Sequence, residues 1–208
     1  MRRSRRPPGS GCSGCECAPM VIYDFDPQNL PDDYLKAIGL VVVAATEAEN
    51  VMRDFIGAML NIDNVDSISL CTPMPFQLKN QIIRTLNELK APKASELDEL
   101  DDIFDRIEAA IQKRNSIAHS SFPIHPETKQ VYRYKEKARG ALSAEMVEVT
   151  VEELIGIAKE IHESGLLLME FMMKRGLGPQ HRTEPLREPI SRGKKAREDR
   201  RAAYGDSY

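Results

Sequence analysis

Apolar residues recur at intervals of three and four along most of the chain, the spacing that places them on one face of an α-helix. The first run follows Pro31 and continues to Asn61, with two neighbouring apolar rows, so this helix is expected to be largely buried. The link that follows, 62–75, contains Asp63 and two prolines and is predicted to be a loop. Three further runs predict helices from Phe76 to Ala91, from Ser95 to His119 and from Thr150 to Gly176.

The apolar pattern changes between the third and fourth predicted helices. The stretch from Phe122 to Pro126 contains two prolines, and proline removes a backbone donor inside a helix. Apolar residues then cluster over 131–134 and 146–149, on either side of Gly140, which predicts a small hairpin or an extended loop. The expected fold is all-α: an up-down bundle of four main helices, with this insertion between the third and the fourth.

Both ends of the chain lack helical periodicity. We expect residues 1–20 to be a disordered basic leader, 21–176 a helical domain and 177–208 a disordered basic tail. Residues 1–20 carry four Arg and one Glu, a net charge of +3, and residues 174–208 carry ten basic and five acidic residues, a net charge of +5. The middle carries the other 15 basic and 26 acidic residues, so its charge is −11. Basic ends either keep the protein in solution or attract nucleic acid non-specifically, and both interpretations stay open.

The cysteines and the apolar runs indicate whether the chain is a metal-binding, membrane or secreted protein. Cys12, Cys15 and Cys17 lie together in the leader, while Cys71 is far away along the chain. A structural metal site usually needs four ligands, so we expect no metal and no cofactor, with a zinc site in the leader as the alternative. The most apolar stretch, 38–45, is too short to span a bilayer, and no secretory apolar segment follows the basic N-terminus. We therefore expect a cytoplasmic protein with no membrane partner.

One charged residue interrupts the apolar row of the third predicted helix. After Ile111 the row reaches Arg114, where an apolar residue is expected, and Ala118 is predicted to resume it. A guanidinium on a packing face needs a carboxylate, carbonyl groups or a phosphate to accept its hydrogen bonds. Asn115 and His119 are four residues apart and therefore share a helix face beside it.

These three residue types suit the cleavage of RNA without a metal. Arg114 would clamp a phosphate through paired hydrogen bonds, His119 would exchange a proton near neutral pH, and Asn115 would position an oxygen. RNA supplies its own nucleophile, the 2′-hydroxyl. One chain offers one such histidine, so an acid, a base and a clamp together require two chains around a two-fold axis.

A structural interpretation of the same residues stays open. Arg114 could pair with an acid of the core and have no role in chemistry. The candidate acids are Asp33, Glu47 and Glu49. The spacing from Arg to His is also loose, since Arg175 and His181 show a similar one in the tail, where glycines and a proline prevent a helix from holding them together.

The segment from Leu97 to Glu170 resembles HEPN domains, the helical nucleotide-binding or RNA-cleaving domains of higher eukaryotes and prokaryotes. The likeness lies in the long helix that ends in Arg114-Asn115-Ser116-Ile117-Ala118-His119-Ser120, in the extended insertion after it, and in Val149–Leu154, which opens the closing helix. The long first helix also fits, so the resemblance covers roughly residues 30–175.

The resemblance implies an up-down helical fold, dimers joined along the motif helices, and metal-independent endoribonuclease activity. Arg114 and His119 become the catalytic pair, with Asn115 as the polar companion of the arginine. The family also contains members that bind nucleotides or act as scaffolds, which gives the alternative of a non-catalytic nucleotide- or RNA-binding protein. In a toxin subgroup a modifiable Tyr lies two residues past the His; here that position is Ser121, so this form of control is not expected.

Three residues of the insertion are candidates for contact with substrate. Arg133 and Lys135 belong to a basic run that would position RNA phosphates, and His125 lies between prolines in a loop next to the motif. The ordinary interpretation of each is a solvated loop residue. The expected partners are RNA, a second copy of the chain and, in a toxin–antitoxin or defence setting, an antitoxin or another regulatory protein.

Overall fold

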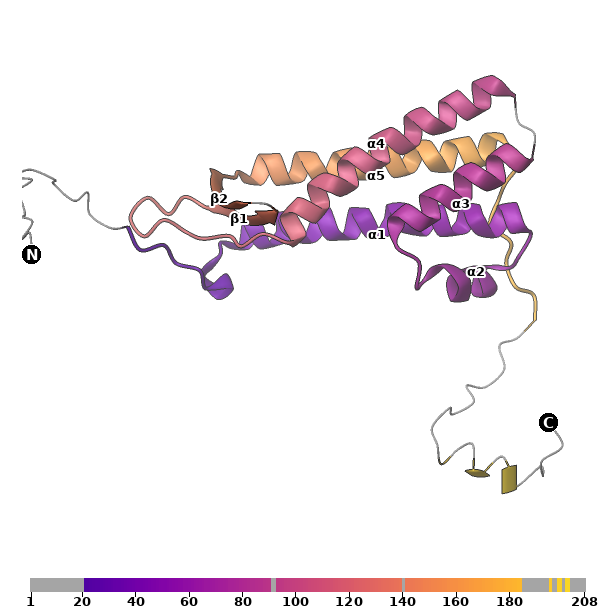
Figure 1. The fold of residues 1–208 in the computed structure, drawn as a ribbon, viewed down its shortest axis with the longest axis horizontal. Helices are drawn as coiled ribbons and strands as arrows, with labels where there is room; N and C mark the ends of the chain where they lie inside the picture. The colour runs from indigo at the N-terminus through magenta and orange to yellow at the C-terminus, as the bar shows by residue number, and fades with distance from the viewer. Residues whose placement is uncertain are drawn as a thin grey trace, which may run out of the picture.

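The computed structural model describes residues 21–90, 93–139 and 141–184, together with 195, 198, 199, 201 and 202. The predicted leader lies outside the described residues, as does most of the predicted tail. The described part is mostly helical and contains one small antiparallel sheet (Figure 1). This agrees with the expected all-α class, and of the two alternatives for the insertion the structure has the hairpin.

The element boundaries follow the apolar pattern closely in four helices and in the hairpin. The helices are α1 (Asp32–Leu60), α2 (Asn64–Cys71), α3 (Phe76–Leu89), α4 (Ala94–Ala118) and α5 (Val151–Lys174), and a short 3-10 turn, η1 (Pro27–Asn29), precedes them. The strands are β1 (Tyr132–Arg139) and β2 (Ala141–Glu148). Helix α5 begins after Thr150 as predicted, and Thr150 is its cap, since its Oγ1 accepts a hydrogen bond from the Glu153 N–H (3.1 Å). Helix α4 begins one residue before the predicted start, so Ser95 lies inside it.

The three longest helices form the body of the bundle, with α1 and α5 running in the same direction and α4 against both (Figure 1). Tyr34 near the start of α1 donates from its hydroxyl to the carbonyl oxygen of Val149, just before α5 (3.0 Å), and Glu47 in the middle of α1 lies 3.6 Å from His162 in the middle of α5. Lys174 at the end of α5 contacts Glu99 near the start of α4 at 3.1 Å. These contacts align α1 with α5 and set α4 antiparallel to α5.

The core fills the space between these helices. Phe55 of α1, Phe104 of α4 and Phe171 of α5 are fully buried, and the rings of Phe55 and Phe171 meet edge to face with centroids 6.1 Å apart. Helices α1 and α5 approach closely where Gly165 meets Ala48, since a Cβ on Gly165 would lie 3.4 Å from the Ala48 Cα. The pairing of α1 with α5 therefore forms the centre of the fold.

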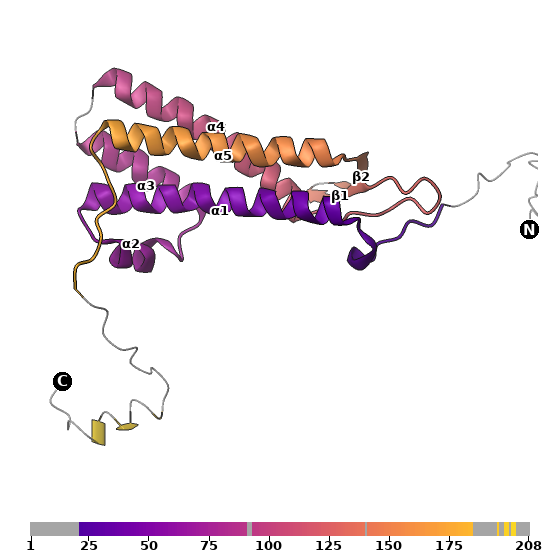
Figure 2. The ribbon, with the colours of Figure 1, turned by 180° about the vertical axis from the view of Figure 1, so that it is seen from behind.

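The direction of α3 departs from the up-down order that we expected. Lys79, near the start of α3, pairs with Glu49 in the middle of α1 at 2.8 Å, and Asn87, near its end, accepts a hydrogen bond from Arg175 at the end of α5. Helix α3 therefore runs parallel to α1, because the chain returns through α2 to the middle of α1 before α3 begins (Figures 1 and 2). Helices α2 and α3 thus cover only the C-terminal half of α1.

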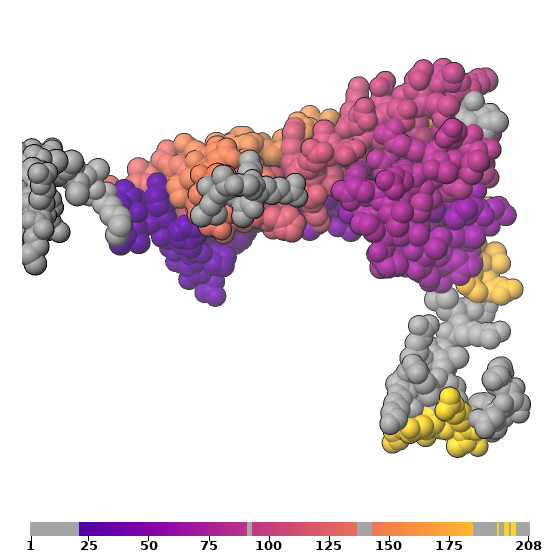
Figure 3. Space-filling model, in the orientation of Figure 1, coloured from indigo at the N-terminus to yellow at the C-terminus, as the bar shows by residue number. Residues whose placement is uncertain are grey.

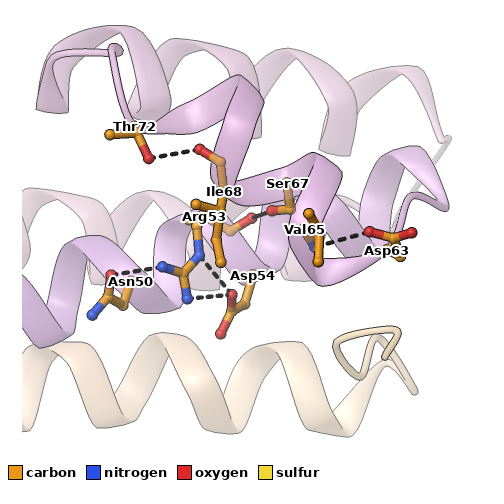
Figure 4. Close-up of polar contacts among 8 residues, drawn as sticks. All are labelled: Asn50, Arg53, Asp54, Asp63, Val65, Ser67, Ile68 and Thr72. Carbon is orange, nitrogen blue, oxygen red and sulfur yellow. Dashed lines mark hydrogen bonds and ion pairs between the residues drawn. The ribbon is translucent and has the colours of Figure 1, made fainter. Parts of the chain in front are cut away.

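Helix α2 was not predicted from the sequence. Asp63, expected in a loop, is its N-cap, and the Asp63 carboxylate accepts hydrogen bonds from the N–H groups of Val65 and Asp66 (2.9 and 3.0 Å). Ser67 then donates from its Oγ to the carbonyl oxygen of Arg53 on α1 (2.9 Å), as Figure 4 shows. A helix of eight residues is too short to be stable alone, so α2 depends on this docking to α1.

Helix α2 lies so close to α1 that Gly57 has no room for a side chain. A Cβ at Gly57 would lie 2.8 Å from the Oγ and 2.9 Å from the Cβ of Ser67. We expect Gly57→Ala to lower the free energy of unfolding by about 1–3 kcal/mol, despite the better helix propensity of Ala. In the control Gly156→Ala on α5, the new Cβ meets nothing within 4 Å, and a gain of about 0.5–1 kcal/mol is expected. Denaturant unfolding measures both, and a gain at Gly57 would contradict the close docking.

Backbone hydrogen bonds hold the hairpin beside the end of α4. Ser121, just after α4, and Tyr134 of β1 exchange backbone hydrogen bonds of 3.1 and 2.8 Å. Ile124 forms a further bridge with Asp24 from the N-terminal segment (3.0 and 2.8 Å). The end of α4 and the hairpin consequently lie on one face of the molecule, away from the end that α3 covers (Figure 3).

Candidate functional site at the end of helix α4

Arg114 lies on the side of α4 that faces the core. Ile107 and Ile111 of the same row are 1% and 4% exposed, whereas Arg114 is half-buried. The predicted continuation at Ala118 is wrong, because Ala118 is exposed and Ile117 is buried instead. The buried row steps by three residues at this end, from Ile111 through Arg114 to Ile117, which rotates it slightly around the helix. The interruption of an apolar row by Arg114, inferred from the sequence, is thus present in the structure.

The guanidinium of Arg114 is only partly satisfied within its own chain. Its Nη1 donates to the Oδ1 of Asn115 at 2.9 Å, so these neighbours form the polar pair that the sequence suggested. Its Nε is buried and has no acceptor, and the described residues provide no carboxylate partner for any of its nitrogens. Leaving a buried donor unpaired costs on the order of 1–3 kcal/mol. Arg114 is therefore a cation with unused hydrogen-bonding capacity.

The intramolecular salt bridge considered for Arg114 is not formed within the described part of the chain. Glu49 accepts a hydrogen bond from Lys79 (2.8 Å), and Glu47 lies closest to His162 (3.6 Å). Asp33 is at the start of α1, where its carboxylate accepts a hydrogen bond from the N–H of the next residue (3.0 Å). Each of the three candidate acids thus contacts a group other than Arg114.

His119 is the residue at which α4 ends. Its backbone N–H donates to the carbonyl oxygen of Asn115 (3.1 Å). Its side chain is exposed and has no hydrogen-bond partner among the described residues. The imidazole therefore stands one turn beyond the Arg114–Asn115 pair, open to solvent. A single chain presents one exposed histidine and one half-buried arginine at this end of the helix.

The hairpin brings two of the predicted basic residues to the same end of α4. The Nζ of Lys135 donates to the Oγ of Ser116 at 3.2 Å, which places an ammonium against the motif itself. Arg133, two residues earlier on β1, lines a groove of about 720 Å³ between α4 and α5, together with Ser116 and Lys113. Ser116 and Lys113 were not singled out in the sequence, since a serine and a lysine on an exposed helix face carry no recognisable pattern.

The remaining candidate, His125, serves the local structure of its loop. Its Nδ1 accepts hydrogen bonds from the N–H groups of Glu127 and Thr128, both at 3.2 Å, and its ring meets Tyr23 edge to face at 5.4 Å. Within the described chain no contact joins His125 to the motif at the end of α4. The structure thus groups Arg133 and Lys135 with the motif and leaves His125 in its turn.

Over the residues that the structure covers, no three His, Cys, Asp or Glu side chains are grouped so as to hold a metal ion. Cys12, Cys15 and Cys17, the candidates for a zinc site, lie outside those residues. No helix in the same part of the chain is both long and apolar enough to cross a membrane. No protein-family model, curated protein or solved structure matches this chain. Its chemistry therefore has to be inferred from the residues at the end of α4.

Proposed function

We propose that this chain is a HEPN-like, metal-independent endoribonuclease, with a composite site built from Arg114, Asn115 and His119 of two copies. The observation that carries this proposal is Arg114, a half-buried guanidinium with a buried Nε that has no acceptor and with no carboxylate partner in the described chain. A phosphate is the ligand that meets such a group with paired acceptors and opposite charge. Binding RNA would offset the cost of the unpaired donor.

The chemistry assigned to these residues is a transesterification. His119 of one copy would take the proton of a 2′-hydroxyl while the 2′-oxygen attacks the adjacent phosphorus. The bond from phosphorus to the 5′-oxygen breaks, and the imidazolium of the second copy's His119 would give its proton to that leaving oxygen. The products are a 2′,3′-cyclic phosphate and a 5′-hydroxyl. The two Arg114 side chains would stabilise the negative charge that grows on the phosphoryl oxygens.

The surroundings of the motif support an RNA substrate. Lys135 contacts Ser116 of the motif and Arg133 lines the neighbouring groove, so two further cations lie at this end of α4. The same groove contains Glu153 and Glu160, and the body of the chain is acidic overall. Such cations would hold the phosphates on either side of the scissile one and carry no sequence preference. The arrangement of motif helix α4, hairpin and closing helix α5 agrees with the resemblance to HEPN domains. A cytoplasmic toxin–antitoxin or defence role, with a regulatory protein partner, belongs to the same proposal.

Incubation of the purified protein with single-stranded RNA in excess EDTA tests the proposal. We expect fragments that end in a 2′,3′-cyclic phosphate, which a phosphatase and periodate sequence distinguishes from other ends. Intact RNA after prolonged incubation at high protein concentration would reject the enzymatic proposal. Fragments with 3′-hydroxyl ends would reject the mechanism, because attack by the 2′-hydroxyl cannot form them.

One observation favours the second candidate, a protein that binds RNA or nucleotide without cleaving it. The imidazole of His119 has no partner among the described residues that would orient it, whereas a general base is usually held by another group. In that case RNA would be retarded in a gel but left intact. The retention would also weaken steeply as salt is raised, because phosphate contacts release counterions.

A further inference from the structure

The N-terminal half of α1 contains a segment without charge on any side. From Ala37 to Thr46 the chain has no charged residue, so the helix is apolar all round. Helices of this kind are normally covered on every side. Here Val41 and Ala45 are fully buried against the bundle, but Leu40 and Val43 are 52% and 55% exposed. Part of this segment is therefore an apolar surface that the described part of its own chain leaves open.

The two most exposed of these side chains lie in a short row that ends in charges of opposite sign, while Val42, 41% exposed, lies on another side of the helix. Lys36, Leu40, Val43 and Glu47 follow at intervals of four, three and four, so at about 100° per residue they fall within roughly 60° of one another. Lys36 stands at one end of the row and Glu47 at the other. The described residues provide no ion pair for Lys36, and Glu47 faces only His162 at 3.6 Å. We call these four residues the α1 row.

The neighbouring helix extends this surface. The Tyr34 hydroxyl donates to the Val149 carbonyl oxygen at 3.0 Å, and Glu47 lies beside His162, so α1 and α5 keep an offset of 115 residues along this stretch. Ile155 of α5 is therefore level with Leu40, and it is 46% exposed. In the view from behind, α1 and α5 lie side by side in front of α4, and no other described helix or strand covers them along this half (Figure 2).

We propose that a second copy of the chain covers the α1 row, with the two α1 helices antiparallel around a two-fold axis between Leu40 and Val43. Each residue then faces the one placed symmetrically about that midpoint. Leu40 meets Val43 of the second copy, and Lys36 meets Glu47, twice. The row is thus complementary to itself in both shape and charge, which an isologous contact requires. An unrelated partner would have no reason to match this palindromic order.

This contact is independent of the proposed function. The contact of Glu47 with His162 sets the α1 row beside α5. The motif ends α4, which passes behind α1 and α5 in Figure 2, and the hairpin lies next to that end. Two chains joined through the α1 row keep both motifs open, so a composite Arg114–His119 site needs a separate contact. The composite site also joins two chains, so the oligomeric state of the native chain alone reports on both contacts. The change in mass caused by Leu40→Glu and the RNA assay report on different surfaces, and these two results separate the proposals.

Sedimentation of the full chain tests the contact through Leu40. We expect Leu40→Glu to reduce the mass of the native species by about a factor of two, because each contact would then bury two carboxylates. The matched control is Leu89→Glu at the end of α3, a site 76% exposed and outside the row, which should leave the mass unchanged. A monomeric native chain, or an unchanged mass for Leu40→Glu, would overturn the proposal.

A charge exchange tests the antiparallel register and guards against a misfolded Leu40 variant. Lys36→Glu and Glu47→Lys should each weaken self-association, because each sets like charges opposite one another. The double variant restores both pairs in reversed order and should recover native association, with unchanged circular dichroism throughout. Failure of the double variant to recover, while it stays folded, contradicts the register. Capture of an unrelated protein by a monomeric chain would identify another occupant and overturn the proposal as well.

Discussion

His119→Ala is expected to abolish RNA cleavage, with a loss of at least about 100-fold in the rate. The imidazole is the group to which the proposal assigns both proton transfers, and no neighbouring side chain among those described at the end of α4 is placed to replace it. RNA binding should change little, since the phosphate contacts assigned to Arg114, Arg133 and Lys135 remain. Cleavage rate and gel retardation, measured on the same preparation, separate these two effects.

The stability of the His119 variant should match that of the native chain, because the side chain is exposed and without partners in the described region. His162→Ala is the matched control: His162 is also exposed, at 53% of its side chain, but lies on α5. We expect that control to keep full activity. Cleavage by the His119 variant within about threefold of native would remove His119 from the mechanism, and loss of cleavage in both variants would point to a contaminating nuclease.

Glu49→Leu is expected to give the largest loss of stability among polar substitutions, about 3 kcal/mol. Glu49 bonds the Nζ of Lys79 at 2.8 Å, and only 7% of the Lys79 side chain is exposed. Without the carboxylate, an ammonium would be held between α1 and α3 with no counter-charge. Because the Glu49 side chain is 30% exposed, water screens part of this effect, and the expected value lies at the low end for a buried pair.

Replacing both partners should recover most of that loss. In Glu49→Leu with Lys79→Met no buried charge remains, and two apolar side chains of similar size fill the junction, so stability within about 1 kcal/mol of native is expected. The surface pair formed by Glu160 and Lys113 is the control, and Glu160→Leu should cost less than about 1 kcal/mol. A double-mutant cycle by denaturant unfolding measures the coupling, and additive effects would show that Lys79 is solvated in solution.

The elements with strong periodicity could be read from the sequence. Helix α1 was predicted from Pro31 to Asn61 and spans Asp32–Leu60, and α5 begins after its Thr150 cap. The hairpin was predicted from two apolar clusters around Gly140. In these cases one local signal, an apolar period or a cap, is enough to fix the element.

The missed features depend on contacts between distant segments. Helix α2 exists because Ser67 docks on the backbone of α1, and nothing in its own eight residues gives that contact. The parallel direction of α3 follows from the path of α2, so it too could not be predicted from the sequence. At the site, the position of Arg114 in an apolar row was predictable, but the contact between Lys135 and Ser116 required the hairpin to fold back on α4.

The central pairing of α1 with α5 also constrains how the chain can fold during synthesis. The two helices meet across a separation of 115 residues, as the Tyr34–Val149 contact shows, so α1 leaves the ribosome long before its main partner exists. At typical rates of translation this delay is on the order of ten seconds. During that time the uncharged segment from Ala37 to Thr46 has no core to enter. Folding is therefore expected to be largely post-translational, with chaperones shielding the first helix until the last one arrives.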